Sequence, residues 1–209
     1  MTVLNRIAYF QNRRDEVPNQ ELAGELAATK NKKGIKEIAV NLWSDNRNVQ
    51  SDCLKVLYEI GYLEPALIAD YADDFLRLLQ NRNNRLVWGS MAALAAIAEL
   101  KAKELFPRMA EIEQAMENGS VITVDNGVLA LARIASTDAK RRKAIFPYLL
   151  KHLATCRLKE VPQHAEKTLV AVNAANKQEF IATLEARLGG TSGSQAARVK
   201  RVVKTASTR

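Results

Sequence analysis

Apolar residues recur along this chain at intervals of three and four positions, the spacing of one face of an α-helix. One apolar triplet returns twice at a spacing of 37 residues. Its three copies are Leu54, Leu57 and Ile60; Met91, Leu94 and Ile97; and Val128, Leu131 and Ile134. A fixed period of this length is typical of repeat proteins, in which stacked units bury a core that no single unit could bury. The pattern therefore predicts an all-α repeat protein.

Between Asn-, Asp- and Gly-containing turns, the same periodicity predicts a leading helix and then successive helix pairs. The predicted helices cover residues 1–11, 20–29, 34–43, 47–60, 65–79, 85–100, 104–116, 121–135, 139–155, 161–173 and 177–188. We expect Asn19 and Asp138 to act as helix N-caps, and a break near Asp70. Phe106-Pro107 and Phe146-Pro147 occupy matching places in two second helices, where proline kinks a helix or begins one.

The end of the chain differs from the rest in composition. Residues 189–194 are Gly, Ser and Thr only, which is typical of a flexible linker. A short basic helix is predicted at 195–204, with Val199, Val202 and Val203 as its apolar side. We therefore expect a repeat domain over residues 1–189 and a Gly/Ser linker plus basic tail over 190–209.

Helix pairs with Asn or Asp turns, a repeat length in the high thirties and Phe-Pro in second helices resemble HEAT repeats of the armadillo-like superfamily. The resemblance covers roughly Asn19 to Leu188 and points to no single family. It implies an α-solenoid of antiparallel helix pairs, wound as a right-handed superhelix of about five repeats.

The chain has 209 residues, and its ordinary apolar and charged fractions suit one folded domain or one short solenoid. No secretory signal begins it, and no apolar run approaches the ~20 residues that span a bilayer. We expect a cytoplasmic protein that does not bind membranes. Cys53 and Cys156 lack CxxC spacing, so we interpret them as packed thiols.

The formal net charge is +8, and two segments carry much of it. One is the run Lys140, Arg141, Arg142 and Lys143. The other is the C-terminal set Arg198, Lys200, Arg201 and Lys204, followed by Arg209, with no acid after residue 189. Such segments attract phosphates or acidic partners, although a run of this kind can also be solvated helix surface.

Catalytic motifs are not evident. The only histidines, His152 and His164, have no Cys, Asp or Glu that we recognise at metal-ligand spacing on the same helix face, and no HExxH occurs. No GxxxxGK[ST], GxGxxG or GxSxG motif is present. We expect no enzyme activity, no cofactor and no metal site.

One repeat position breaks the apolar pattern, because Ser51, Trp88 and Asp125 are equivalent in the 37-residue register. Arg85 lies one turn before Trp88, and together they could hold an acidic peptide, or a phosphate and a stacked base. Alternatively, Trp88 covers the gap above Gly89 and packs on the adjacent repeat.

Asp125 allows a second comparison. The segment Thr123–Asn126 is loosely similar to a motif of HEAT-like alkylpurine DNA glycosylases, which would make the acid part of a DNA site. The paired tryptophans of that motif are absent here. Asp125 is otherwise interpreted as an acid in the first helical turn, where it favours the helix dipole.

These patterns predict a non-enzymatic scaffold that binds a protein partner on its concave surface, through Arg85, Trp88 and Asp125. The alternative is a nucleic-acid-binding protein, with or without a relation to the glycosylases, that contacts phosphates through the two basic segments.

Overall fold

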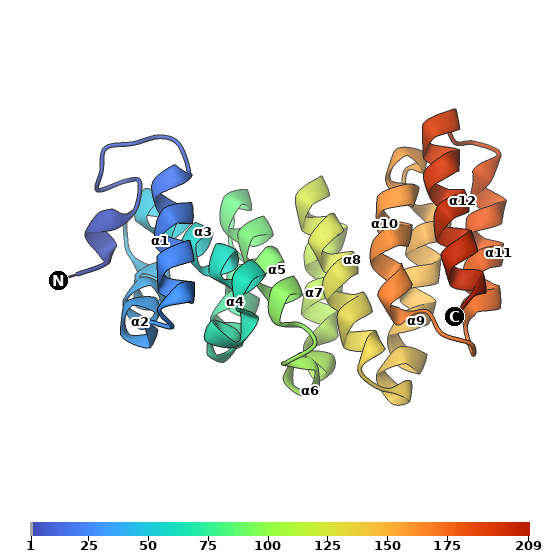
Figure 1. Cartoon of the computed structure of the whole chain (residues 1–209), viewed down its shortest axis with the longest axis horizontal. Coiled ribbons are helices and arrows are strands. Elements are labelled where there is room, and N and C mark those ends of the chain that lie inside the picture. Colours follow the sequence, from blue (N-terminus) through green and yellow to red (C-terminus); the bar gives the residue numbers. More distant parts are fainter. Residues whose placement is uncertain (1) are drawn as a thin grey trace. The chain divides into compact units, whose positions relative to one another are not determined.

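The computed structural model describes residues 2–209, and within them all regular structure is helical (Figure 1). Contacts along the chain divide it into two compact units. Unit 1 runs to Gly127, and unit 2 runs from Val128 to Arg209. The predicted all-α class is confirmed, and the two units are described separately below.

Unit 1 contains the helices α1 (Val17–Ala28), α2 (Lys32–Val40), α3 (Arg47–Leu63), α4 (Ala72–Leu78), α5 (Asn84–Ile97), α6 (Ala102–Leu105) and α7 (Met109–Glu117). Helix α3 packs against α1 on one side and α5 on the other, and α4 packs on α5. Asn31, Asn46 and Asn83 begin α2, α3 and α5, because the side chain of each accepts hydrogen bonds from backbone N–H groups in the first turn.

Helix α8 (Val121–Ser136) starts in unit 1 and continues into unit 2. Unit 2 also contains α9 (Ala139–Thr155), α10 (Val161–Thr168), α11 (Lys177–Leu188) and α12 (Gly193–Ser207). Asp138 caps α9 as predicted, since its carboxylate accepts the backbone N–H of Arg141 at 2.8 Å. The α-helices up to α11 follow one another as the successive helix pairs that the sequence predicts.

The 37-residue echo marks the core, as predicted. All nine residues of the three apolar triplets are at most 1% exposed. Small residues let the helices approach closely. A Cβ added at Gly89 would lie 2.8 Å from Leu54 Cδ2, so this glycine is needed where α5 crosses α3.

The leading helix predicted over residues 1–11 is wrong. Met1 lies outside the described residues, and the remainder contains one 3₁₀ turn at Leu4–Arg6. Some backbone N–H groups here bond to nearby carbonyls in turns, and others bond to side chains of other elements, so no helical ladder forms. Ala8 N donates to Asn19 Oδ1 at 2.9 Å, and Tyr9 N donates to Asp52 Oδ2 at 2.8 Å.

The same bonds explain a second error. Asn19 is not an N-cap, because α1 begins at Val17, with Pro18 in its first turn. Asn19 is fully buried, and its side chain holds the N-terminal segment against α1.

Two breaks in second helices are accounted for by local sequence. The predicted break near Asp70 is confirmed, since 3₁₀ turns at Pro65–Leu67 and Ala69–Tyr71 precede α4. Phe106-Pro107 forms the 3₁₀ turn Phe106–Arg108 between α6 and α7, whereas Pro147 lies inside an uninterrupted α9. The Phe-Pro pair therefore ends a helix in one repeat and is tolerated within a helix in the other.

The basic C-terminal segment forms a longer helix than predicted, α12, which packs on α10 and α11. Ser192 and Gln195 form a capping box at its start. Val199 and Val202 are buried, while Val203 is half-buried. Because this apolar stripe is covered, residues 190–209 belong by contact to unit 2, whereas the sequence placed a domain boundary at 189/190.

Candidate functional site

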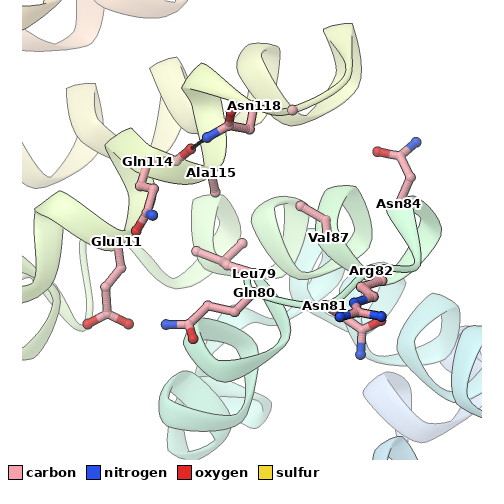
Figure 2. Close-up of a pocket in the computed structure, with 11 residues that line it drawn as sticks. Leu79, Gln80, Asn81, Arg82, Asn84, Val87, Glu111, Gln114, Ala115 and Asn118 are labelled. Carbon is pink, nitrogen blue, oxygen red and sulfur yellow. Dashed lines mark hydrogen bonds between the residues drawn. The ribbon is translucent and has the colours of Figure 1, made fainter.

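Three neighbouring pockets lie in unit 1, and together we call them the polar groove. The first, of about 390 Å³, lies between the N-terminal segment and α3. It shares Asn48, Ser51 and Arg85 with the second, of about 800 Å³, at the starts of α3 and α5. The second shares residues 80–82 and Asn84 with the third, of about 460 Å³, which α7 completes (Figure 2).

Positive charge dominates the middle of the groove. The second pocket is lined by Arg47, Arg82 and Arg85, with no carboxylate in its lining. The carboxylates of the flanking pockets have partners within the protein. Asp15 pairs with Arg13 at 2.8 Å and Glu111 pairs with Arg108 at 2.6 Å, while Asp52 accepts the N–H of Tyr9. The centre of the groove therefore attracts anions.

Side-chain amides supply most of the remaining polar lining. They are Asn12, Asn48, Gln50, Gln80, Asn81, Asn83, Asn84, Gln114 and Asn118. Some of them shape the turn before α5. Asn81 accepts the N–H of Asn83 at 2.8 Å, and Asn83 accepts that of Arg85 at 3.0 Å. Figure 2 shows Gln80, Asn84 and Gln114 around the third pocket. Each amide offers both a donor and an acceptor.

Arg85 is exposed on the first turn of α5 and lines two of the three pockets. Its Nη2 lies 3.0 Å from Oε1 of Glu16, which precedes α1. The same Glu16 carboxylate reaches Lys55 Nζ at 2.8 Å. One acid thus holds two cations from neighbouring helices beside the groove.

Lys55 is 5% exposed and is the most enclosed charge of this region. Its Nζ also bonds to Glu59 at 2.6 Å and lies 4.9 Å from the centre of the Tyr58 ring. Burial alone would lower the pKa of Lys55, but the hydrogen bonds that its Nζ donates to Glu16 and Glu59 outweigh this effect and raise the pKa. Burial raises the pKa of Tyr58 to about 12. The lysine is therefore charged and the phenol neutral at pH 7.

Trp88 is half-buried, and its ring centre lies 5.7 Å from that of Tyr58 on α3. Tyr58 in turn lies 5.7 Å from the more exposed Tyr62. Trp88 does pack on the preceding repeat, yet part of its ring remains accessible beside Arg85. It does not line the polar groove itself.

Asp125 is half-buried on α8, one repeat further along the chain. It lines none of the three pockets of the groove. Of the residues predicted from the mismatched repeat position, the structure therefore places Arg85 in the groove and Trp88 beside it, and it does not bring Asp125 to them.

The predicted basic patch is partly engaged within unit 2. Arg141 bonds to Asp138 and Thr137, and Arg142 donates to the Ser136 carbonyl at 3.1 Å. Lys140 and Lys143 are exposed at the start of α9.

The C-terminal part of the patch divides in the same way. Arg198 pairs with Glu166 of α10 at 2.7 Å, whereas Lys200, Arg201 and Lys204 are exposed on α12. Three of the eight predicted patch residues thus bond within unit 2, and the other five are exposed.

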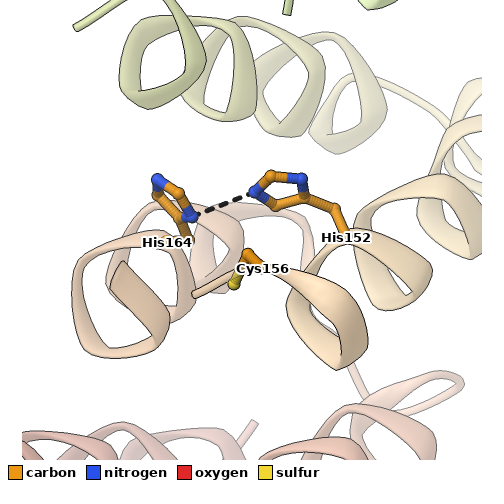
Figure 3. A group of neighbouring side chains, drawn as sticks. All are labelled: His152, Cys156 and His164. Carbon is orange, nitrogen blue, oxygen red and sulfur yellow. Dashed lines mark hydrogen bonds between the residues drawn. The ribbon is translucent and has the colours of Figure 1, made fainter. Parts of the chain in front are cut away.

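The two histidines lie next to a cysteine, contrary to the prediction from their spacing in the sequence. Cys156 lies one helical turn after His152, at the end of α9, and His164 approaches both from α10 (Figure 3). His152 Nε2 and His164 Nδ1 are 2.9 Å apart. Burial, and then His164, lower the pKa of His152 to about 4, and burial raises the pKa of the Cys156 thiol. The expectation that neither histidine has a cysteine at ligand spacing is therefore wrong.

No protein-family model and no curated protein sequence matches this chain. Solved structures do. An engineered protein matches with a TM-score of 0.68 and 18% identity, over 100% of this chain and 98% of its own. A designed armadillo repeat protein, solved in complex with the peptide (KR)4, matches with a TM-score of 0.68 and 14% identity, over 88% of this chain and 85% of its own.

The chain has an armadillo/HEAT-like helical-repeat fold. This confirms the all-α helical-repeat fold predicted from the sequence. A helical-repeat fold places its side chains for binding on helix surfaces and on the turns between helices, and the polar groove lies at such turns. Among the described residues, no helix is both long and apolar enough to cross a membrane.

Proposed function

We propose that this chain is a non-enzymatic scaffold that binds an extended, acidic segment of a protein partner along the polar groove of unit 1. The observation that carries the proposal is the middle pocket, where Arg47, Arg82 and Arg85 converge without a carboxylate in the lining. Arginine pairs with carboxylates through two parallel hydrogen bonds, a geometry that suits the acidic side chains of a peptide.

The amides explain why an extended segment fits better than a small ligand. An extended peptide exposes main-chain N–H and C=O groups that must find partners when they leave water. Gln80, Asn84 and Gln114 can each donate to a carbonyl and accept from an N–H. The groove also runs over three pockets, so it offers contacts along a chain instead of one enclosed cavity.

The structural neighbours support a peptide as the class of partner. The charge of that peptide is inferred from the groove of this chain. The designed armadillo repeat protein was solved with a basic peptide, (KR)4. The groove of this chain has the opposite preference, because arginines line its centre. Trp88 is half-buried against Tyr58, so part of it stays accessible one turn after Arg85, where an apolar or aromatic side chain of the partner can pack. We assign no contact with this partner to Asp125.

Fluorescence anisotropy with labelled octapeptides tests the proposal. An alternating Glu-Ser peptide should bind more tightly than (KR)4, and its affinity should fall as salt rises. Arg82→Ala should weaken binding roughly tenfold, which corresponds to about 1.4 kcal/mol. Arg77→Ala is the matched control, because Arg77 is an exposed arginine that stacks on Trp43 and does not line the groove.

Two results would reject the proposal. Tighter binding of (KR)4 than of the acidic peptide would contradict the charge argument, and equal effects of the Arg82 and Arg77 variants would contradict the location. A labelled DNA single strand of equal charge covers the alternative. If DNA binds more tightly and Lys140→Ala with Lys143→Ala removes that binding, the nucleic-acid function replaces this one.

A further inference from the structure

The cluster of His152, Cys156 and His164 belongs to unit 2, shares no residue with the polar groove of unit 1, and has no part in the proposed function. The two histidine nitrogens and the sulfur all lie within 4.8 Å of one another. His164 is fully buried, and His152 and Cys156 are half-buried. The three side chains come from two neighbouring elements: His152 from α9, Cys156 from the C-cap of α9, and His164 from α10 (Figure 3).

The distances are close to those of a tetrahedral metal site. Zinc binds nitrogen at about 2.0–2.1 Å and sulfur at about 2.3 Å, which in a tetrahedron separates two nitrogens by about 3.3 Å and a nitrogen from a sulfur by about 3.6 Å. The histidine nitrogens, now 2.9 Å apart, would move apart by a few tenths of an ångström. The sulfur lies within 4.8 Å of the histidine nitrogens and would approach them by rotation about χ1 of Cys156.

We propose that His152 Nε2, His164 Nδ1 and Cys156 Sγ form a binding site for a zinc ion, with water as the fourth ligand. Two imidazoles and one thiolate are borderline and soft ligands, which favour zinc over magnesium or calcium because those ions require oxygen. The ion would join the end of α9 to α10 and thereby stabilise unit 2.

The surroundings fit a dication held by three protein ligands. Glu160 lies close enough to act electrostatically on both His152 and Cys156, and it adds negative charge near the site. Its carboxylate also pairs with Arg157, so we assign the fourth position to water instead. Arg187 donates to the Cys156 carbonyl and fixes the backbone of the ligand.

Cobalt(II) is a direct probe, because thiolate ligation gives a near-ultraviolet charge-transfer band and tetrahedral geometry gives intense visible bands. The reduced, metal-free full chain should bind one equivalent of cobalt with both signatures, and zinc should displace it. The sequence contains only two cysteines, so the sulfur can be assigned. Cys156→Ser should abolish the charge-transfer band, and Cys53→Ser should preserve it.

His152→Gln gives a second readout at a half-buried position. Loss of this ligand should weaken zinc affinity by on the order of 100-fold or more, since even outer-shell changes cost 10–100-fold. Saturating zinc should also raise the thermal unfolding midpoint of the wild-type chain and not that of Cys156→Ser. Circular dichroism of the metal-free variants shows whether each is folded before titration.

The proposal fails if the folded, reduced chain binds no cobalt or zinc at micromolar concentrations. It also fails if the charge-transfer band survives in Cys156→Ser, or if binding is equal in wild type and His152→Gln. In those cases the cluster is a neutral histidine pair that packs α9 on α10. None of these outcomes changes the expected peptide affinity of the polar groove, which lies in the other unit.

Discussion

The polar groove of unit 1 and the His–Cys cluster of unit 2 differ in almost every physical respect. The groove is wide and open to solvent, and exposed arginines give its centre a positive charge. The cluster is small and enclosed, with His164 fully buried and His152 and Cys156 half-buried. Yet both lie at helix ends, where the 37-residue pattern has stopped. The apolar repeat positions therefore form the core, and the candidate binding residues lie at helix ends and turns.

The largest expected effect tests whether unit 2 depends on its last helix. Val199 is fully buried, so Val199→Asp would bury a carboxylate without a partner. We expect a loss of about 3 kcal/mol or more in the free energy of unfolding, measured by urea denaturation. Val203→Asp is the control. Val203 is half-buried, so the carboxylate of the introduced aspartate could reach water. Equal losses would show that α12 does not dock as described.

The next effect concerns the charge network beside the groove. Lys55→Met keeps the aliphatic stem but leaves Glu16 and Glu59 without their shared cation. We expect a loss of about 2 kcal/mol, less than for a fully buried pair because both acids are partly exposed. Lys101→Met removes a cation paired with the exposed Glu104 and should cost under about 0.5 kcal/mol. Similar values for the two variants would contradict a special role for Lys55.

A drop in pH should weaken the ion pair that joins α12 to α10 in unit 2. The hydrogen bond from Arg198 lowers the pKa of Glu166 below its ordinary 4.5. A carboxylate with a lowered pKa stabilises the fold above its unfolded pKa, and this stability is lost as the pH falls through the folded pKa. Amide hydrogen exchange in α12 should therefore accelerate, relative to intrinsic rates, once the pH falls below 4.5. Glu166→Gln should remove this extra acid sensitivity, and its persistence in that variant would contradict the assignment.

The smallest effect distinguishes the two tryptophans. Trp88→Ala should leave helicity unchanged and weaken binding of the acidic peptide a few-fold, through lost packing beside Arg85. Trp43 is the control, because Arg77 covers its ring at 4.3 Å and its Nε1 donates to Asp74 at 3.0 Å. Trp43→Ala should not change peptide affinity. Unfolding of Trp88→Ala would instead make Trp88 a core residue.

Sequence periodicity predicted the core correctly because burial follows repeat position. Met91 and Val128 could be placed from Leu54 alone, since a solenoid repeats its neighbours. The structure of the N-terminal segment could not be predicted in this way. Its backbone bonds to Asn19 and Asp52, and such distant partners leave no local signal in an apolar pattern.

The candidate sites were predictable only in part. Arg85 was identified by its mismatched repeat position, but its partner Glu16 lies 69 residues away in sequence. The arginine-lined turn at residues 80–85 was read as a connection and not as a binding surface. The His152–Cys156 spacing of one helical turn was visible in the sequence, and only the arrival of His164 from α10 gives it meaning.

Hydrogen-exchange mass spectrometry of the chain with the acidic peptide tests the central claim most directly. The account predicts that the peptide protects residues 47–51 and 80–85, which line the middle pocket, and leaves α9 and α12 unchanged. Protection confined to the exposed lysines of α9 and α12, with none at residues 80–85, would contradict it.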